Sequence, residues 1–261
     1  MNLGTAVNSL CMEELGGRLG RAEVWEHRAA WQGYSGMGGT ADLLETTAAF
    51  LQARLAKGTP VSPANLRLVN GVSAGLEVLA WVLADPGDLV IVPTPTYSRF
   101  FSDMNERMKT CVVGMELEEG FSLTADLLEG RISELKKAGG KVKAFLFCNP
   151  SNPLGVIYTR QLVLELMEVC KRHSIHFISD EIYALSVFDQ SAEFSSVLSI
   201  PIGSLPDPRR THVLWGLSKD LGLAGFRMGF VHSLSEEVLR SIDGMKFYTC
   251  VPAHIQQVGS M

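Results

Sequence analysis

Lys219 is the residue whose surroundings indicate covalent chemistry. It lies in the run Gly216-Leu217-Ser218-Lys219-Asp220, directly after the apolar stretch Thr211–Trp215, and a second cation follows at Arg227. Burial and a neighbouring positive charge favour the neutral form of a lysine amine, and this form is required for Schiff-base chemistry with an aldehyde cofactor. A Ser-Lys-Asp turn on a protein surface has the same spelling. The hypothesis therefore depends on what other segments place beside this lysine.

Strand-like and helix-like segments alternate through the middle of the chain. Short apolar runs bounded by turn residues predict strands over 66–69, 88–92, 110–115, 141–148, 175–179, 211–215 and 226–232. Apolar residues at helical spacing predict helices from the N-cap Thr40 to Gly58, over 73–83, through 100–104 and over 159–173. This alternation predicts an α/β fold with a mostly parallel central sheet.

Polar and aromatic side chains follow several of these strands. In a parallel sheet, ligands bind beyond the carboxyl ends of the strands, so the segments 71–74, 93–97, 149–152, 180–183 and 218–219 are expected to converge. They carry the carboxylate of Asp180, the hydroxyl of Tyr183, the amide of Asn152 and the ring of Tyr97. Taken singly, these residues fit a helix cap, a packed tyrosine, a turn and a core aromatic equally well.

The small-residue run 70–75 precedes a predicted helix, whose free N–H groups and positive dipole end suit a phosphate. Ser218 could add a hydroxyl and Arg227 a bidentate contact to the same phosphate. A pyridoxal phosphate site needs a lysine, a carboxylate at the pyridine nitrogen, donors at the phenolate oxygen, a stacking ring and an anion cradle. The strand ends supply a candidate for each of these needs.

The order of these motifs resembles the fold-type I, pyridoxal phosphate-dependent class I/II aminotransferase family. The matching segments are 149–155, 179–183 and 218–229. Within that family the chain is most similar to the 1-aminocyclopropane-1-carboxylate synthase-like proteins, through the segments 2–5, 34–39, 148–155 and 217–229. The resemblance covers essentially the whole chain. It implies pyridoxal 5'-phosphate as the cofactor, an amino acid as the substrate and transaminase-type chemistry in amino-acid metabolism.

The resemblance also assigns a role to each site residue. It implies that Lys219 makes the covalent link to the cofactor and moves the α-proton, and that Asp180 pairs with the pyridine nitrogen. Tyr183 and Asn152 would hold the phenolate oxygen, and Tyr97 would stack on the ring. The remaining implied contacts are to the phosphate, from Val72, Ser73, Ala74, Ser218 and Arg227. Tyr34 matches a tyrosine that reaches the neighbouring subunit's site, which implies a homodimer.

Composition excludes several other classes of function. The chain has 261 residues, 46% of them hydrophobic and 20% charged, with a net charge of -5. Lys and Arg are scattered, so no nucleic-acid footprint is expected, and no apolar run is long enough for a membrane span. The five cysteines form no CxxC pair and the histidines lack ligand spacing, which predicts reduced thiols, a cytoplasmic location and no metal site.

Departures from the family pattern leave catalysis open. Gly216 and Val7 stand where the synthases have a serine near the phosphate and a glutamate facing the substrate. The arginine that grips the substrate's α-carboxylate has no match. We therefore expect an N-terminal segment at 1–33, a cofactor-binding large domain at 34–246 and a truncated start of the C-terminal small domain at 247–261. The alternative to an enzyme is a catalytically inactive cofactor-binding or dimerisation protein. An unrelated nucleotide binder is disfavoured, because no strand leads into a G-x-G-x-x-G or P-loop motif.

Overall fold

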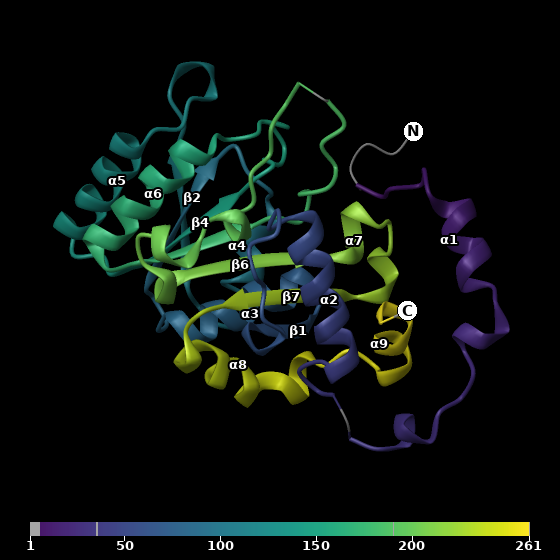
Figure 1. Cartoon of the computed structure of the whole chain (residues 1–261). Coiled ribbons are helices and arrows are strands. Elements are labelled where there is room, and N and C mark those ends of the chain that lie inside the picture. The colour runs from purple at the N-terminus through teal and green to yellow at the C-terminus, as the bar shows by residue number, and fades with distance from the viewer. Residues whose placement is uncertain (1–5, 35, 190, 261) are drawn as a thin grey trace.

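The computed structural model describes residues 6–34, 36–189 and 191–260, arranged around one seven-stranded sheet (Figure 1). The strand order is β1-β7-β6-β5-β4-β2-β3. The strands are β1 (Leu66–Asn70), β2 (Leu89–Thr94), β3 (Cys111–Glu116), β4 (Val142–Cys148), β5 (His176–Asp180), β6 (Thr211–Gly216) and β7 (Met228–Ser233). β7 is antiparallel to both of its neighbours, β1 and β6, and the other described strand pairs are parallel. The predicted α/β class and mostly parallel sheet are confirmed.

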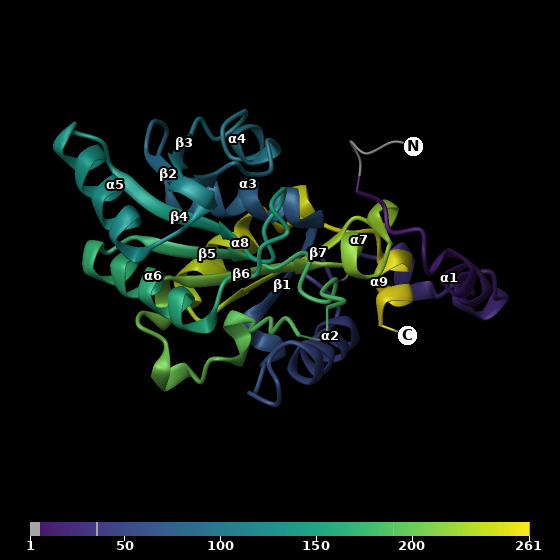
Figure 2. The same cartoon turned by 90° about the horizontal axis from the view of Figure 1, so that it is seen from above.

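Helices cover both faces of the sheet, as the view from above shows (Figure 2). One face packs against α2 (Ala41–Arg54), α5 (Ala125–Lys137) and α6 (Arg160–His173). The other face packs against α3 (Gly71–Leu83), α4 (Arg99–Asp103) and α8 (Glu236–Thr249). Because both faces are covered, the inner strands are nearly continuous apolar runs. In β4, for example, every described position except Lys143 is buried.

The connection between β6 and β7 carries the predicted lysine. It contains the short helix α7 (Leu217–Asp220) and ends at Arg227, whose φ of 53° lies in the left-handed region. The apolar pattern predicts that β7 begins at Phe226. Because of this turn, the strand begins at Met228 instead. The other strands lie within two residues of their predicted bounds.

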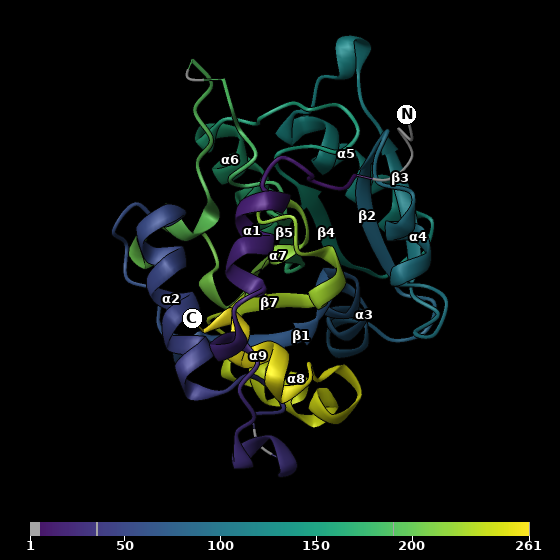
Figure 3. The same cartoon turned by 90° about the vertical axis from the view of Figure 1, so that its right-hand side faces the viewer.

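Two further helices lie at one end of the molecule, α1 (Met12–Leu19) and α9 (Ala253–Gly259) (Figure 3). No residue of α1 is buried. In contrast, α9 is tied to the segment before α2 through Gln256, whose side chain accepts from the Thr40 N–H at 2.9 Å and donates to the Gly36 carbonyl at 2.9 Å. Thr40 does precede α2, but its hydroxyl makes no capping bond. None of the described helices combines the length and the apolar character that a bilayer crossing requires.

Candidate active site

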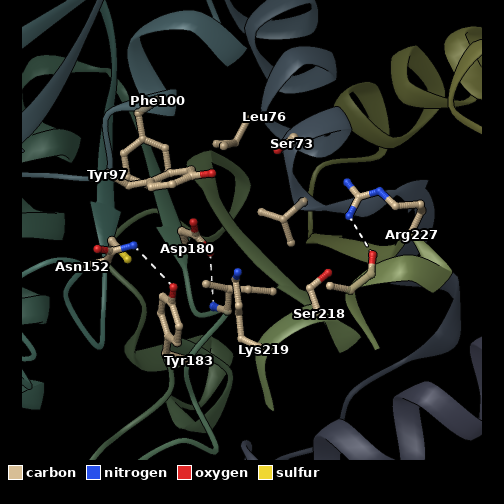
Figure 4. A pocket seen from close by; sticks show the side chains of 14 residues that line it. Ser73, Leu76, Tyr97, Phe100, Asn152, Asp180, Tyr183, Ser218, Lys219 and Arg227 are labelled. Carbon is tan, nitrogen blue, oxygen red and sulfur yellow. Dashed lines mark hydrogen bonds between the residues drawn. The ribbon is translucent and has the colours of Figure 1, made fainter. Parts of the chain in front are cut away.

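The carboxyl ends of the parallel strands surround a cavity of about 210 Å³ (Figure 4). Every predicted site residue except Ala74 and Tyr34 lines it. The lining comes from the start of α3, the segments after β2, β4 and β5, helix α7 and the turn before β7. Among the described residues, no cluster of potential metal ligands is present.

Asp180 is the last residue of β5 and lies within the central part of the sheet, where 4% of its surface is exposed. One carboxylate oxygen accepts from the Ile182 N–H at 3.2 Å. Burial raises the pKa of this carboxyl to about 7, since only that backbone bond stabilises the charged form. Among the described residues, Asp180 forms no ion pair. The site therefore contains a buried carboxylate without a cationic partner.

Lys219 extends from α7 toward the same cavity and is half-buried. Its pKa is lowered, first because burial disfavours the ammonium and second because Arg227 is close. The Nζ atom donates to the Ala6 carbonyl at 2.8 Å, so the N-terminal segment lies at the mouth of the cavity. Asn8 reinforces this contact with a 3.5 Å bond from its side chain to the Lys219 carbonyl.

Tyr183 and Asn152 form one wall of the cavity. The Asn152 amide donates to the Tyr183 hydroxyl at 3.4 Å (Figure 4). Burial raises the pKa of Tyr183 to about 12, so the phenol remains protonated and able to donate. The ring of Tyr97 closes the cavity from another side and is fixed by an edge contact to Phe100, with ring centroids 5.5 Å apart.

The opposite side of the cavity holds Ser73, Ser218 and Arg227 (Figure 4). Ser73 belongs to the first turn of α3, whose N–H groups have no partners within the helix. The φ of Gly71 is +79°, and a Cβ atom there would overlap the Arg227 guanidinium. The arginine thus packs directly against the start of the helix. Its Nη1 atom donates to the Ala224 carbonyl at 3.1 Å, and it has no carboxylate partner among the described residues.

Two predicted residues lie outside the cavity. Ala74 packs half-buried against the core on the α3 face of the sheet, because the helix turns its side chain away from the cavity. Tyr34 is 92% exposed, and its predicted contact with a second subunit stays a prediction. Residues 2–5 and 35 of the motifs that carry the resemblance lie outside the described residues.

Sequence reasoning missed several lining residues, namely Leu76, Phe100, Cys148, Ile182 and Ala224. The helical spacing could have predicted one of them, because Leu76 lies one turn after Val72 on the same side of α3. Cys148 is the last residue of a predicted strand, but nothing in its local sequence indicates that its thiol faces a cavity. Its pKa is raised well above the ordinary value, by burial first and by Asp180 second.

The structure gives a physical reason for Gly216. A Cβ atom at this position would lie 2.7 Å from the Met228 carbonyl oxygen and 3.2 Å from the Gly229 Cα. The close pairing of β6 with β7 therefore leaves no room for a serine side chain. At the other departure, Val7 is 57% exposed on the segment that passes the cavity mouth.

The profile of the aminotransferase class I and II family matches residues 22–260. The chain belongs to this family. Membership confirms the predicted resemblance, and pyridoxal phosphate dependence is general among such aminotransferases.

Two relatives of this chain show the more specific similarity to the synthase-like proteins. The "probable inactive 1-aminocyclopropane-1-carboxylate synthase-like protein 2" of Mus musculus is 37% identical over 95% of this chain and 44% of its own length. The 1-aminocyclopropane-1-carboxylate synthase-like protein 1 of Bos taurus is 35% identical over 95% of this chain and 51% of its own length. This confirms similarity to the synthase-like proteins. The chain spans roughly half the length of these relatives.

Solved structures of the family have the same fold. An archaeal alanine:glyoxylate aminotransferase superposes with a TM-score of 0.80 at 28% identity, over 95% of this chain and 59% of that one. The aspartate aminotransferase of Thermotoga maritima gives a TM-score of 0.79 at 25% identity, over the full chain here and 65% of that one. The described sheet and helices thus correspond to part of an aminotransferase subunit.

Proposed function

We propose that this chain binds pyridoxal 5'-phosphate in the cavity and holds it covalently through Lys219. One observation carries the proposal: Asp180 and Arg227 lie on separate sides of the cavity (Figure 4), and neither has an oppositely charged partner among the described residues. The Asp180 carboxylate is buried, and a buried charge without a partner is unfavourable unless a ligand supplies the opposite charge. The Arg227 side chain is exposed, so its guanidinium is accessible to an anionic group of a ligand. A ligand with a cationic ring nitrogen at one end and a phosphate at the other complements both residues.

The other lining groups fit the same ligand. Pyridoxal phosphate, when bound, supplies an aldehyde for a lysine amine and a ring that withdraws electrons from an attached amino acid. Asp180 would keep a proton on the ring nitrogen, and the Tyr183 and Asn152 donors would face the phenolate oxygen. Tyr97 would cover one face of the ring. Ser73, Ser218, Arg227 and the free N–H groups of α3 would bind the phosphate.

Lys219 would have two functions in amino-acid chemistry. Its lowered pKa leaves more neutral amine at a given pH, which favours covalent capture of the aldehyde. Once released from the cofactor, the same amine lies in the cavity and could accept and return the α-proton. Both functions require that the amine leave the Ala6 carbonyl to which it now donates.

Assembly and location belong to this proposal as well. We propose a homodimer, in which the exposed ring of Tyr34 reaches the cavity of the second subunit. The proposed location is the cytoplasm. We also propose that residues 34–246, which include the sheet and its covering helices, form the cofactor-binding domain.

A second candidate function is cofactor binding without turnover. Among the described residues that line the cavity, Arg227 is the only arginine, and the proposed phosphate contact occupies it. An α-carboxylate would then lack a guanidinium, and Val7 offers no carboxylate toward a substrate amine. One relative is itself named "probable inactive".

The test uses purified chain incubated with pyridoxal phosphate. We expect a new absorbance band, and reduction with borohydride is expected to fix the cofactor mass on the peptide that contains Lys219. Lys219→Ala should abolish the fixed adduct. The matched control is Lys143→Ala, because Lys143 pairs with Asp88 at 3.4 Å and does not line the cavity.

A folded chain that shows neither band nor adduct would refute cofactor binding. If the adduct forms, a panel of amino acids separates the two candidates. Transfer of the amino group to the cofactor, followed through the spectrum, supports the aminotransferase. A stable band that no amino acid changes supports the non-catalytic binder.

A further inference from the structure

Asp220 follows Lys219 directly and does not line the cavity. Its carboxylate accepts three hydrogen bonds instead. Oδ2 accepts from the Trp215 indole at 2.9 Å and from the Leu185 N–H at 3.1 Å, and Oδ1 accepts from the Ser186 hydroxyl at 2.7 Å. Among the described residues, no cation pairs with this carboxylate. It therefore serves as an acceptor for neutral donors.

The three donors come from two separate parts of the fold. Trp215 is the buried penultimate residue of β6. Leu185 and Ser186 belong to the irregular segment after β5, two and three residues beyond Tyr183. The side chain of one residue thus joins the end of β6, the helix that carries Lys219 and the segment that carries Tyr183.

Both of the joined segments have little structure of their own. Helix α7 has four residues, and a helix this short is not stable without tertiary contacts. Its first residue, Leu217, is held in place by burial. Its last residue, Asp220, is held by its side-chain hydrogen bonds. The segment after β5 contains turn bonds, such as the 3.0 Å bond from the Ser186 N–H to the Tyr183 carbonyl. Without Asp220, the end of α7 would lose its side-chain link to that segment.

Helix geometry explains how consecutive residues serve two purposes. Successive side chains on a helix are separated by about 100°, so Lys219 and its neighbour point in different directions. Lys219 enters the cavity, where it lies beside Tyr183 (Figure 4), while the next side chain reaches the segment behind Tyr183. A shift of either segment would change the distance between the amine and the phenol.

We propose that Asp220 is a positioning residue, which fixes Lys219 relative to Tyr183 through its bonds to Trp215, Leu185 and Ser186. This inference rests on the proposed function, since it assigns a purpose to the relative position of two proposed cofactor contacts. It concerns a residue that touches no cofactor atom.

Because all three donors are neutral, substitutions of Asp220 can distinguish the effect of its hydrogen bonds from the effect of its negative charge. In Asp220→Asn, the amide oxygen can still accept from Trp215 and Leu185, and the amide nitrogen can donate to the Ser186 hydroxyl. Asp220→Ala removes all three bonds. A role in positioning therefore predicts that asparagine rescues what alanine loses, whereas a role of the negative charge predicts that both variants fail.

The control variant is Asp207→Ala, at the opposite end of β6. Asp207 caps the turn before that strand, accepts from the N–H groups of Arg209 and Arg210 at 3.2 Å and pairs with the Arg210 guanidinium at 2.8 Å. It resembles Asp220 as a multiply bonded carboxylate beside the same strand, but it lies at the other end of that strand, away from Lys219. Its loss should lower the stability of the chain without changing the position or the reactivity of Lys219.

Two measurements are made on each variant. The first is the pH midpoint for acetylation of Lys219 by acetic anhydride, quantified by mass spectrometry with the exposed Lys137 as internal reference. The second is the rate at which pyridoxal phosphate and borohydride label Lys219. The first measurement needs no cofactor, so it remains informative if the proposed function fails.

We expect Asp220→Ala to move the acetylation midpoint upward, toward that of the exposed reference, because a displaced amine regains water. Labelling by the cofactor should slow by as much as roughly 100-fold, the scale of effect for misplacement by about 1 Å. Asp220→Asn and Asp207→Ala should keep the wild-type midpoint and labelling rate.

An unchanged midpoint in Asp220→Ala, or an equal shift in Asp207→Ala, would overturn the inference. If the alanine variant does not fold, Trp215→Phe and Ser186→Ala each remove one bond, and each must show a smaller shift in the same direction. Wild-type chain that shows the expected midpoints but accepts no cofactor would refute the proposed function while supporting the fixed geometry.

Discussion

Asp180→Asn should stabilise the cofactor-free chain at neutral pH while it weakens cofactor binding. The reason is the isolated carboxylate. Burial raises the pKa of Asp180 from 3.8 to about 7, with the Ile182 N–H as its one backbone donor. A difference of about three pKa units corresponds to roughly 4 kcal/mol of unfolding free energy. Asparagine keeps an acceptor for Ile182 and carries no charge, so it avoids this cost.

The pH dependence gives the sign of the effect. Below the unfolded value of 3.8, the carboxyl is protonated in both states and contributes nothing. As the pH rises toward about 7, the unfolded chain ionises while the folded chain retains its proton. Each pH unit in this window therefore lowers the stability of the wild type by about 1.4 kcal/mol. Above the folded pKa the cost is complete and constant.

The assay is urea unfolding of the cofactor-free wild type and Asp180→Asn at pH 5 and pH 8. The difference between the two proteins should favour the variant by roughly 3 kcal/mol more at pH 8 than at pH 5. Comparing two pH values cancels the pH-independent effects of the amide. Titration of the adjacent Glu181, whose pKa burial also raises to about 7, largely cancels because both proteins contain it.

Pyridoxal phosphate should reverse the order of stability, because a protonated ring nitrogen pairs with the wild-type carboxylate and ligand binding stabilises the folded state. A variant-to-wild-type difference that does not change with pH would refute the reasoning about the unpaired carboxylate. A cofactor that stabilises both proteins equally would refute its pairing with the ring nitrogen.

Three further predictions follow from the same contacts. Arg227→Lys keeps the charge but loses the planar fork, so the affinity for pyridoxal phosphate, measured by absorbance titration, should fall about 10- to 100-fold; an unchanged affinity would place the phosphate elsewhere. Gly71→Ala should lower both this affinity and the melting temperature, because its φ of +79° is strained for alanine and the new Cβ overlaps Arg227. His232 has its pKa lowered to about 4 by burial, so it contributes stability above the unfolded value of 6.5 that is lost as the pH falls toward about 4. His232→Gln should therefore reduce the loss of unfolding free energy between pH 7 and pH 4.5 by up to about 3 kcal/mol, and a loss equal to that of the wild type would contradict the assignment.

The residues themselves indicated the positions of the strands and of most cavity residues, because both depend on local patterns. A short apolar run such as β4 is bounded by turn residues, and the rule that ligands bind beyond parallel strands then selects Asp180 and Lys219. Strand direction is not a local property. The antiparallel β7 has the same apolar pattern as the parallel strands, so this pattern does not indicate that β7 lies between β1 and β6.

Contacts between distant segments account for the features that were not predicted. Two of the Asp220 bonds join residues 34 and 35 positions apart, and Lys219 donates to the Ala6 carbonyl 213 positions away. Neither contact changes the spacing or the composition of the segments that make it. The fit of Gly216 against the β7 backbone has the same origin, because the glycine is required by a partner strand and not by its own turn.

The charges of the cavity separate the two candidate functions. Asp180 and Arg227 each lack an oppositely charged partner among the described residues, and pyridoxal phosphate would supply one to both, which would account for the proposed cofactor binding. An amino acid brings one further charge, its α-carboxylate, and no second arginine among the described lining residues can meet it. In the cavity as described, an amino acid and the corresponding amine without a carboxylate would therefore bind with similar strength. Discrimination between them requires a cation from another segment or another subunit. The aminotransferase and the non-catalytic binder therefore differ in whether the α-carboxylate is bound, and both hypotheses include the same cofactor contacts.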